Sequence, residues 1–136
     1  MRRFLLDTGI AGHYINRRKG VFERARAESA QGNIIGICIP VLAELFYGAE
    51  NSASRDRTIQ QLRRTIPSWR VWPFAAAAAE EFGRLAALLA RTGRPMQKID
   101  IMIAAVAFDI GNCAIVSADS DLFAVPGLVV ENWAKS

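Results

Sequence analysis

Residues 3–9 read Arg3-Phe4-Leu5-Leu6-Asp7-Thr8-Gly9. The short apolar run predicts a buried β-strand, and Thr8-Gly9 predicts a turn directly after it. A carboxylate in such apolar surroundings is costly unless it is paired, hydrogen-bonded or bound to a cation. Because ligands of open α/β sheets bind at the carboxyl ends of the strands, Asp7 is a candidate functional residue.

Beyond this strand, the chain alternates apolar runs with helical patterns. Four further strands are predicted over residues 34–39, 70–72, 113–117 and 128–131. Helices are predicted within 12–31, with a break near Gly20, and over 41–50, 55–66, 75–91 and 100–110; residues 119–123 form a short turn or helix. Glu80 and Arg84 have the spacing of an ion pair within the long helix. Strands that alternate with helices indicate the α/β class with a mainly parallel sheet.

Length and composition restrict the class of protein. The chain has 136 residues, of which 51% are hydrophobic and 22% are charged, so we expect one globular domain over residues 1–136. No apolar run approaches the ~20 residues that span a bilayer, and the N-terminus lacks the apolar core of a signal peptide. With only Cys38 and Cys113, we expect a reduced, cytoplasmic protein that does not associate with a membrane.

The net charge of +4 is unevenly distributed along the chain. Residues 1–70 hold twelve Lys and Arg against six Asp and Glu, whereas residues 71–136 hold five against seven. A basic half indicates a polyanionic partner, although a charge of this size also fits a solvated basic surface. The carboxylates need a separate explanation.

Four carboxylates occupy apolar surroundings. Asp7 and Asp119 each follow a predicted buried strand, Asp100 opens the most apolar helix, and Glu44 lies inside the helix after the second strand. If they converge on one pocket, like charges raise one another's pKa values strongly unless a cation neutralises them. Mg²⁺ and Mn²⁺ prefer oxygen ligands, so the pattern predicts an acidic metal site.

Each of these acids also has a purely structural explanation. Asp7 and Asp100 are both placed to cap a helix, Asp119 to form a turn, and Glu44 to point into solvent. Asp121 is either a fifth acidic ligand or a solvated turn residue.

Two further residues are set aside as structural. Asp109 lies about 180° around its helix from Asp100 and therefore faces away from such a site. His13 is the only histidine, which excludes cleavage by a pair of histidines, and we expect it to be a surface or packing residue.

A set of motifs in a fixed order gives the chain a family resemblance. They are Leu6-Asp7-Thr8, Val41-Leu42-Ala43-Glu44-Leu45 with Tyr47-Gly48, Asp100-Ile101-Met102-Ile103-Ala104-Ala105, Ile115-Val116-Ser117-Ala118-Asp119 with Phe123, Val125-Pro126-Gly127-Leu128, and Glu131-Asn132-Trp133. The chain resembles PIN domains, and more closely the VapC-type toxin ribonucleases. The resemblance extends over essentially the whole chain.

The resemblance implies a three-layer α/β/α sandwich and an endoribonuclease that depends on Mg²⁺ or Mn²⁺. It implies an acidic catalytic site supported by the hydroxyls of Thr8 and Ser117, and cleavage that leaves a 5′-phosphate and a 3′-hydroxyl. Transfer RNA is a common target of such toxins. The implied catalytic acids are Asp7, Glu44, Asp100 and Asp119, and the candidate metal ligands are Asp7, Asp100, Asp119 and Asp121.

This sequence departs from the family pattern at two positions. The family often has Asn where this chain has Gly9, which removes a polar contact. The last acidic motif usually places an acid directly before Phe, but Leu122 holds that place and Asp121 lies one residue earlier. The departure leaves the position of a second metal open.

The resemblance also implies a homodimer and a cognate VapB-type antitoxin that masks the acids. The helix over 55–66, with basic and apolar faces, is suited to a partner of this kind or to covering the core. RNA around an acidic pocket needs cations nearby. The candidates are Arg17, Arg18, Lys19, Arg94 and Lys98, and a solvated basic face is the alternative for each.

Other classes of protein explain parts of this pattern. Asp7-Thr8-Gly9 after an apolar run is also typical of aspartic proteases, but their fold is nearly all β and this chain is rich in helices. A non-catalytic module that binds nucleic acid or protein, with the acids acting only as caps, is the main alternative. Within the nuclease hypothesis, DNA is the alternative substrate.

Overall fold

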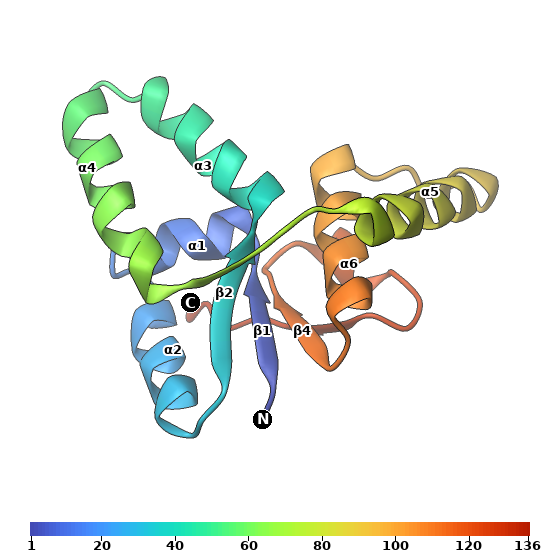
Figure 1. Cartoon of the computed structure of the whole chain (residues 1–136), viewed down its shortest axis with the longest axis horizontal. Helices are drawn as coiled ribbons and strands as arrows, with labels where there is room; N and C mark the ends of the chain where they lie inside the picture. The colour runs from blue at the N-terminus through green and yellow to red at the C-terminus, as the bar shows by residue number, and fades with distance from the viewer.

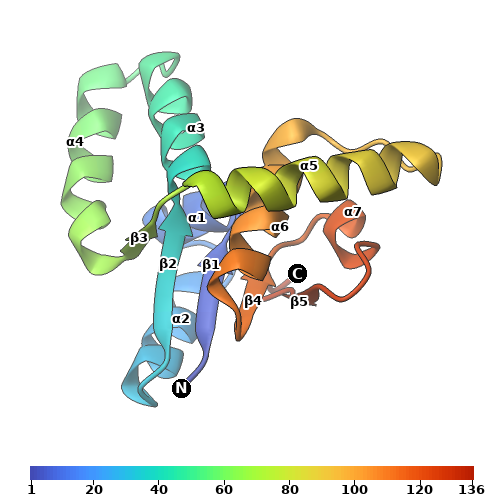
Figure 2. The same ribbon diagram turned by 45° about the vertical axis from the view of Figure 1, so that its right-hand side comes forward.

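The computed structural model describes residues 1–136 and contains a five-stranded, wholly parallel sheet with the order β3-β2-β1-β4-β5 (Figures 1 and 2). The strands are β1 (Arg3–Leu6), β2 (Ile34–Cys38), β3 (Arg70–Trp72), β4 (Cys113–Val116) and β5 (Val129–Glu131). The register pairs Leu6 with Val116, so β1 and β4 end side by side in the middle of the sheet. All five predicted strands are present, and the predicted parallel sheet is confirmed.

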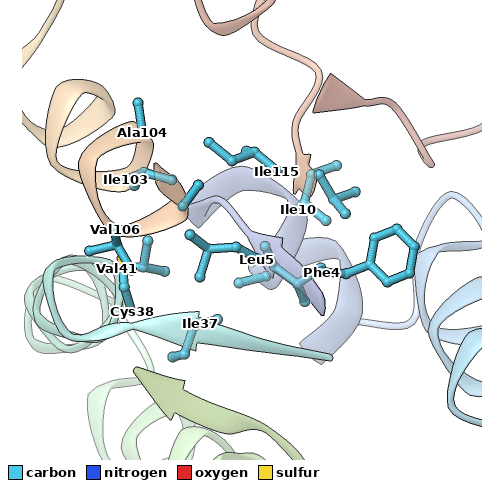
Figure 3. Packing of buried hydrophobic residues seen from close by; sticks show 14 of the residues in the cluster. Phe4, Leu5, Ile10, Ile37, Cys38, Val41, Ile103, Ala104, Val106 and Ile115 are labelled. Atoms are coloured by element: carbon cyan, nitrogen blue, oxygen red, sulfur yellow. The ribbon is translucent and has the colours of Figure 1, made fainter. Parts of the chain in front are cut away.

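Helices connect the strands and cover both faces of the sheet, which confirms the predicted three-layer α/β/α sandwich (Figure 1). They are α1 (Thr8–Ile15), α2 (Val21–Ala30), α3 (Ile39–Glu50), α4 (Arg55–Thr65), α5 (Ala76–Arg91), α6 (Lys98–Ile110) and α7 (Ser120–Phe123), with a 3₁₀ turn η1 (Ile66–Ser68) after α4. Side chains of β1 alternate between the two layers, as a pleated strand requires. In Figure 3, Leu5 points toward α3 and α6, and Phe4 points to the opposite face.

The predicted turn at Thr8-Gly9 is wrong, because α1 begins at Thr8. Asp7 is the N-cap of this helix, and its Oδ1 accepts a hydrogen bond from the backbone N–H of Ile10 at 2.9 Å. The predicted helical region within 12–31 is therefore the end of α1 and the whole of α2. The break near Gly20 is confirmed, since this glycine adopts φ +74° immediately before α2.

Arg84 pairs with Glu81 at 2.8 Å, one residue later than the predicted Glu80. Both spacings bring side chains together on a helix, so sequence spacing alone does not choose between them. Cys38 and Cys113 are free, as expected, and burial raises the pKa values of their thiols to about 11 and about 12.

One close approach fixes the position of β2 against β3. A Cβ atom on Gly36 would lie 2.0 Å from the carbonyl oxygen of Arg70, so no other residue fits without moving the backbone.

The core between the layers includes Phe4, Leu5, Ile37 and Ile103, all at most 1% exposed. None of the helices has both the length and the apolar character needed to cross a lipid bilayer. The packed centre of the sheet thus fixes where the ends of β1 and β4 lie.

Candidate active site

A pocket of about 290 Å³ opens beyond the carboxyl ends of β1 and β4. It is lined by Asp7, Thr8, Gly9, Ile10, His13, Glu44, Gln97, Ile99, Asp100, Ala118 and Asp119. These residues come from the start of α1, the middle of α3, the start of α6 and the loop after β4. We call this the acidic pocket, because it contains all four predicted catalytic acids and no Lys or Arg.

Asp7 is held rigidly at the floor of the acidic pocket. Its side chain is 8% exposed, and its backbone N–H donates to the carbonyl of Val116 at 3.1 Å, which joins it to β4. Burial raises the pKa of Asp7, while hydrogen bonds from Ser117 and from Ile10 act in the opposite direction. Asp7 therefore caps α1 and also faces the pocket. Its structural role as a helix cap and its candidate role in the site do not exclude each other.

Glu44 is linked directly to α1. The hydroxyl of Thr8 donates a hydrogen bond to Oε1 of Glu44, and the carboxylate is partly buried. The alternative in which Glu44 points freely into solvent is wrong. This hydrogen bond joins the first turn of α1 to α3, and the supporting role of the Thr8 hydroxyl in catalysis stays a prediction.

Asp119 and Ser117 form a connected turn after β4. The backbone N–H of Asp119 donates to Oγ of Ser117 at 2.9 Å, and Oδ1 of Asp119 accepts from the N–H of Asp121 at 2.9 Å. Ser117 is fully buried, so its hydroxyl holds the turn from below the acidic pocket. Asp121 is exposed and does not line the pocket.

Asp100 lies in the first turn of α6, but it is not the N-cap, because Gln97 occupies that position. Burial, as the larger cause, and the charges of neighbouring acids together raise the pKa of Asp100 from 3.8 to about 6. Those acids are Asp119, Asp7, Glu44 and Asp121. Five carboxylates therefore share one electrostatic field, in which the charged form of Asp100 is disfavoured.

The acidic pocket also contains residues that sequence reasoning missed. His13 and Gln97 line it, and the charge of His13 lowers the pKa of Asp7 slightly. The expectation that His13 is a surface or packing residue is not contradicted, but it did not place this residue at the acidic pocket. A helix that begins at Thr8 puts Gly9 and His13 on one face, so a correct start for α1 would have revealed this residue.

None of the five predicted RNA-binding cations lines the acidic pocket. All five are exposed, and Arg17 instead lies with its guanidinium 3.3 Å from the ring centroid of Phe22. Arg94 and Lys98 flank the start of α6, close in sequence to Asp100. The acidic pocket is thus formed without any of the predicted RNA-binding cations among its lining residues.

The donor set suits a hard divalent cation, because every charged donor of the acidic pocket is a carboxylate oxygen. No three Asp, Glu, His or Cys side chains are close enough together to ligate one ion at the same time. With the side chains placed in this way, one or two carboxylates and several waters would complete the coordination. That arrangement is how proteins usually bind Mg²⁺.

Residues 4–128 match the family model of the PIN domain. The chain belongs to the PIN domain family. This PIN domain is 34% identical over 134 residues to the tRNA(fMet)-specific endonuclease VapC of Shigella flexneri, covering 98% of this chain and 100% of the relative. It is 26% identical to ribonuclease VapC2 of Rickettsia felis, covering 97% and 98% of the two chains. The resemblance to VapC-type proteins is confirmed.

Solved structures agree with this assignment. The PIN domain superimposes on VapBC2 from Rickettsia felis bound to a promoter DNA fragment with a TM-score of 0.88 and 27% identity, covering 96% of this chain and 98% of the other. The DNA-bound VapBC of Salmonella typhimurium gives a TM-score of 0.88 and 29% identity, covering 98% and 100%. The fold and the sequence therefore place this chain beside the same group of proteins.

Proposed function

We propose that this PIN domain is a metal-dependent endoribonuclease that acts as the toxin of a VapBC-type toxin–antitoxin pair. The observation that carries the proposal is the convergence of four carboxylates, from four separate parts of the chain, on one pocket that contains no Lys or Arg. Relatives with the same fold are named ribonuclease or endonuclease VapC. Bringing unpaired carboxylates together in a partly buried pocket costs folding free energy. Binding of a cation is the usual function that explains such a cluster.

Mg²⁺ or Mn²⁺ is the cofactor in this proposal. When bound, such an ion lowers the pKa of a ligated water and offsets charge on the scissile phosphate. One or two of Asp7, Asp100 and Asp119 would hold it directly, with waters completing the coordination, and Asp121 is the remaining candidate ligand. The cap on Asp7 and the turn around Asp119 fix two of these carboxylates before the ion arrives.

Glu44 has a separate role in the proposed reaction. Held by Thr8, it accepts a hydrogen bond from the attacking water and orients that water toward phosphorus. The bond between phosphorus and the 3′-oxygen breaks, so the products carry a 5′-phosphate and a 3′-hydroxyl. His13 also lines this pocket, beside the four carboxylates.

The proposed substrate is RNA, with transfer RNA as the first candidate. Relatives from Shigella flexneri and Salmonella typhimurium are named tRNA(fMet)-specific endonucleases. Arg17, Arg18, Lys19, Arg94 and Lys98 are all exposed, and we propose that they contact phosphates around the pocket. The reaction would take place in the cytoplasm.

The proposed partners are a VapB-type antitoxin and a second copy of this chain. Structures similar to this one are complexes of VapB with VapC. Exposed large apolar residues, including Tyr47 at 70% and Phe123 at 51%, provide surface that a protein partner can cover.

The test is cleavage of total cellular RNA by purified protein free of antitoxin, in Mg²⁺, Mn²⁺ or EDTA. Wild type should give discrete fragments only with metal, and Asp7→Asn should give none, although Asn still caps α1. Asp109→Asn is the matched control, because Asp109 is exposed and does not line the acidic pocket. Absence of cleavage by folded wild type under every metal would favour the non-catalytic binding module.

A further inference from the structure

A series of adjoining pockets continues from the acidic pocket along α1. A pocket of about 380 Å³ between α1, α3 and α4 shares Thr8 and Glu44 with the acidic pocket. The next, of about 310 Å³, shares Ile15 and Gln61 with that one. The last, of about 580 Å³, shares Tyr14 with its neighbour. The adjoining pockets therefore follow α1 from the acidic pocket to the other end of the helix. The eight residues of α1 span a length of roughly 12 Å.

The far end of this path is basic. Arg17 and Arg64 line one of its two pockets, Arg17 and Arg26 line the other, and no Asp or Glu lines either. None of these three arginines takes part in an ion pair, unlike Arg24 or Arg55. Their charges are therefore not neutralised by the protein. We call these two pockets, where α1, α2 and α4 meet in Figure 1, the arginine groove.

Two of the arginines are held in place without a carboxylate. The guanidinium of Arg17 lies 3.3 Å from the ring centroid of Phe22, and that of Arg26 lies 5.8 Å from the same centroid. Such contacts orient a guanidinium and leave its N–H donors free. Arg17 also has φ 54°, a left-handed conformation that is uncommon for a residue other than glycine.

A buried donor faces the same groove. Tyr14 lines both pockets and is only 8% exposed, and its hydroxyl makes no hydrogen bond within the protein. Nε1 of Trp69 is the only side-chain polar atom that is both fully enclosed and without a hydrogen-bond partner. The unpaired hydroxyl of Tyr14 is therefore not fully enclosed, and it remains accessible from the groove. Ser68 lines both pockets as well. The groove thus combines free guanidinium donors with hydroxyl donors.

We propose that the arginine groove binds backbone phosphates of the RNA strand whose scissile bond lies in the acidic pocket. The inference rests on the proposed function. Phosphate oxygens match a site made of guanidinium and hydroxyl donors with no carboxylate. Because the acidic pocket repels a polyanion, attachment a few nucleotides away holds the strand while the reacting bond enters the pocket. The groove therefore favours longer RNA strands over short ones.

The test compares Arg64→Gln and the double variant Arg17→Gln/Arg64→Gln with Arg63→Gln. Arg63 is exposed on the same turn of α4 but lines no part of the groove, so it is a matched control. With a long RNA, we expect the double variant to raise KM about tenfold with kcat unchanged. For Arg64→Gln, an oligonucleotide that fills only the acidic pocket should show no change in KM. Each lost phosphate contact should reduce the slope of log K against log salt by about 0.7 for single-stranded RNA.

Several results would overturn this inference. Equal KM values and equal salt slopes for Arg64→Gln and Arg63→Gln would show that the groove binds no RNA. Loss of binding to an acidic peptide, with RNA cleavage intact, would assign the groove to a protein partner. Wild type that cleaves no RNA would instead refute the proposed function, and the salt slope of RNA binding would then decide the groove by itself. Arg64→Gln alone carries the test if the double variant does not fold.

Discussion

Glu131 and the acids of the acidic pocket are all wholly or partly buried carboxylates, but their partners differ. Glu131 ends β5 and accepts hydrogen bonds from Nη2 of Arg2 at 2.7 Å and from Nε1 of Trp133 at 3.0 Å. Arg24 lies 3.5 Å away. Burial raises the pKa of Glu131, but the hydrogen bonds and charges of these neighbours outweigh it and lower the pKa overall.

The acidic pocket shows the opposite balance. No arginine or lysine lines it, and burial raises the pKa values of both Asp7 and Asp100. Ionised Glu131 therefore stabilises the fold, whereas ionised Asp100 costs stability. Acids that are kept together despite such a cost are a physical indication of a site that acts on something outside the protein.

The largest expected effect is that of Asp100→Asn on cleavage. Removing this carboxylate should lower the rate by about a thousandfold, because several kcal/mol of transition-state stabilisation depend on the cation it helps to hold. The same substitution should raise the free energy of unfolding at pH 7 by about 1 kcal/mol, after allowance for solvent screening. Relief of repulsion should exceed the lost interaction with the N-terminus of α6. The checks are single-turnover cleavage and urea unfolding, and a loss of stability would contradict the comparison.

The next effect is stabilisation by the metal itself. Mg²⁺ at about a hundred times its Kd should raise the free energy of unfolding by about 2.7 kcal/mol if it binds only the folded chain. Thermal unfolding with and without Mg²⁺ measures this. The shift should be largely lost in Asp7→Asn and should persist in Glu131→Gln. An equal shift in all three proteins would mean that the ion binds elsewhere.

Much of the fold could be predicted because its signals are local. Each strand is a short apolar run, and the residues of α6 are apolar on almost every side, so both follow from composition alone. The four acids were found for a related reason. A carboxylate that directly follows buried residues is unusual wherever it occurs, and parallel strands bring such positions to one edge.

The remaining features depend on contacts that are distant in sequence. Gly9 suggested a turn, but the cap made by Asp7 starts α1 at Thr8, before the helical region predicted within 12–31. The position of His13 at the pocket was missed for this reason. The direction of Arg17 depends on the packing of α1 against α2 and on its contact with Phe22. No spacing rule reports such an arrangement, so the sequence alone could not place the Arg17 side chain relative to the acids.

The pH dependence of stability should separate the two kinds of carboxylate. The folded-state pKa of Asp100 is about 6, above its ordinary value of 3.8, so the unfolded chain releases this proton first and stability falls as pH rises between about 4 and 6. Glu131 has a lowered pKa, so its contribution is complete above its ordinary value of 4.5 and is lost as pH falls below that. Urea midpoints of wild type and Asp100→Asn should therefore agree near pH 4 and diverge toward pH 7. A constant difference across this range would be inconsistent with the raised pKa.

The smallest effect is expected for Glu131→Gln, which tests the paired member of the comparison. It should lower the free energy of unfolding at pH 7 by about 1 kcal/mol, because partly exposed ion pairs contribute little and the hydrogen bond to Trp133 adds a similar amount. Urea unfolding at low and high salt measures this, with a smaller loss at high salt. RNA cleavage should stay at the wild-type rate, since Glu131 does not line the acidic pocket. If Glu131→Gln instead stabilised the protein, as Asp100→Asn is expected to do, arginine partners would not be what distinguishes the two regions.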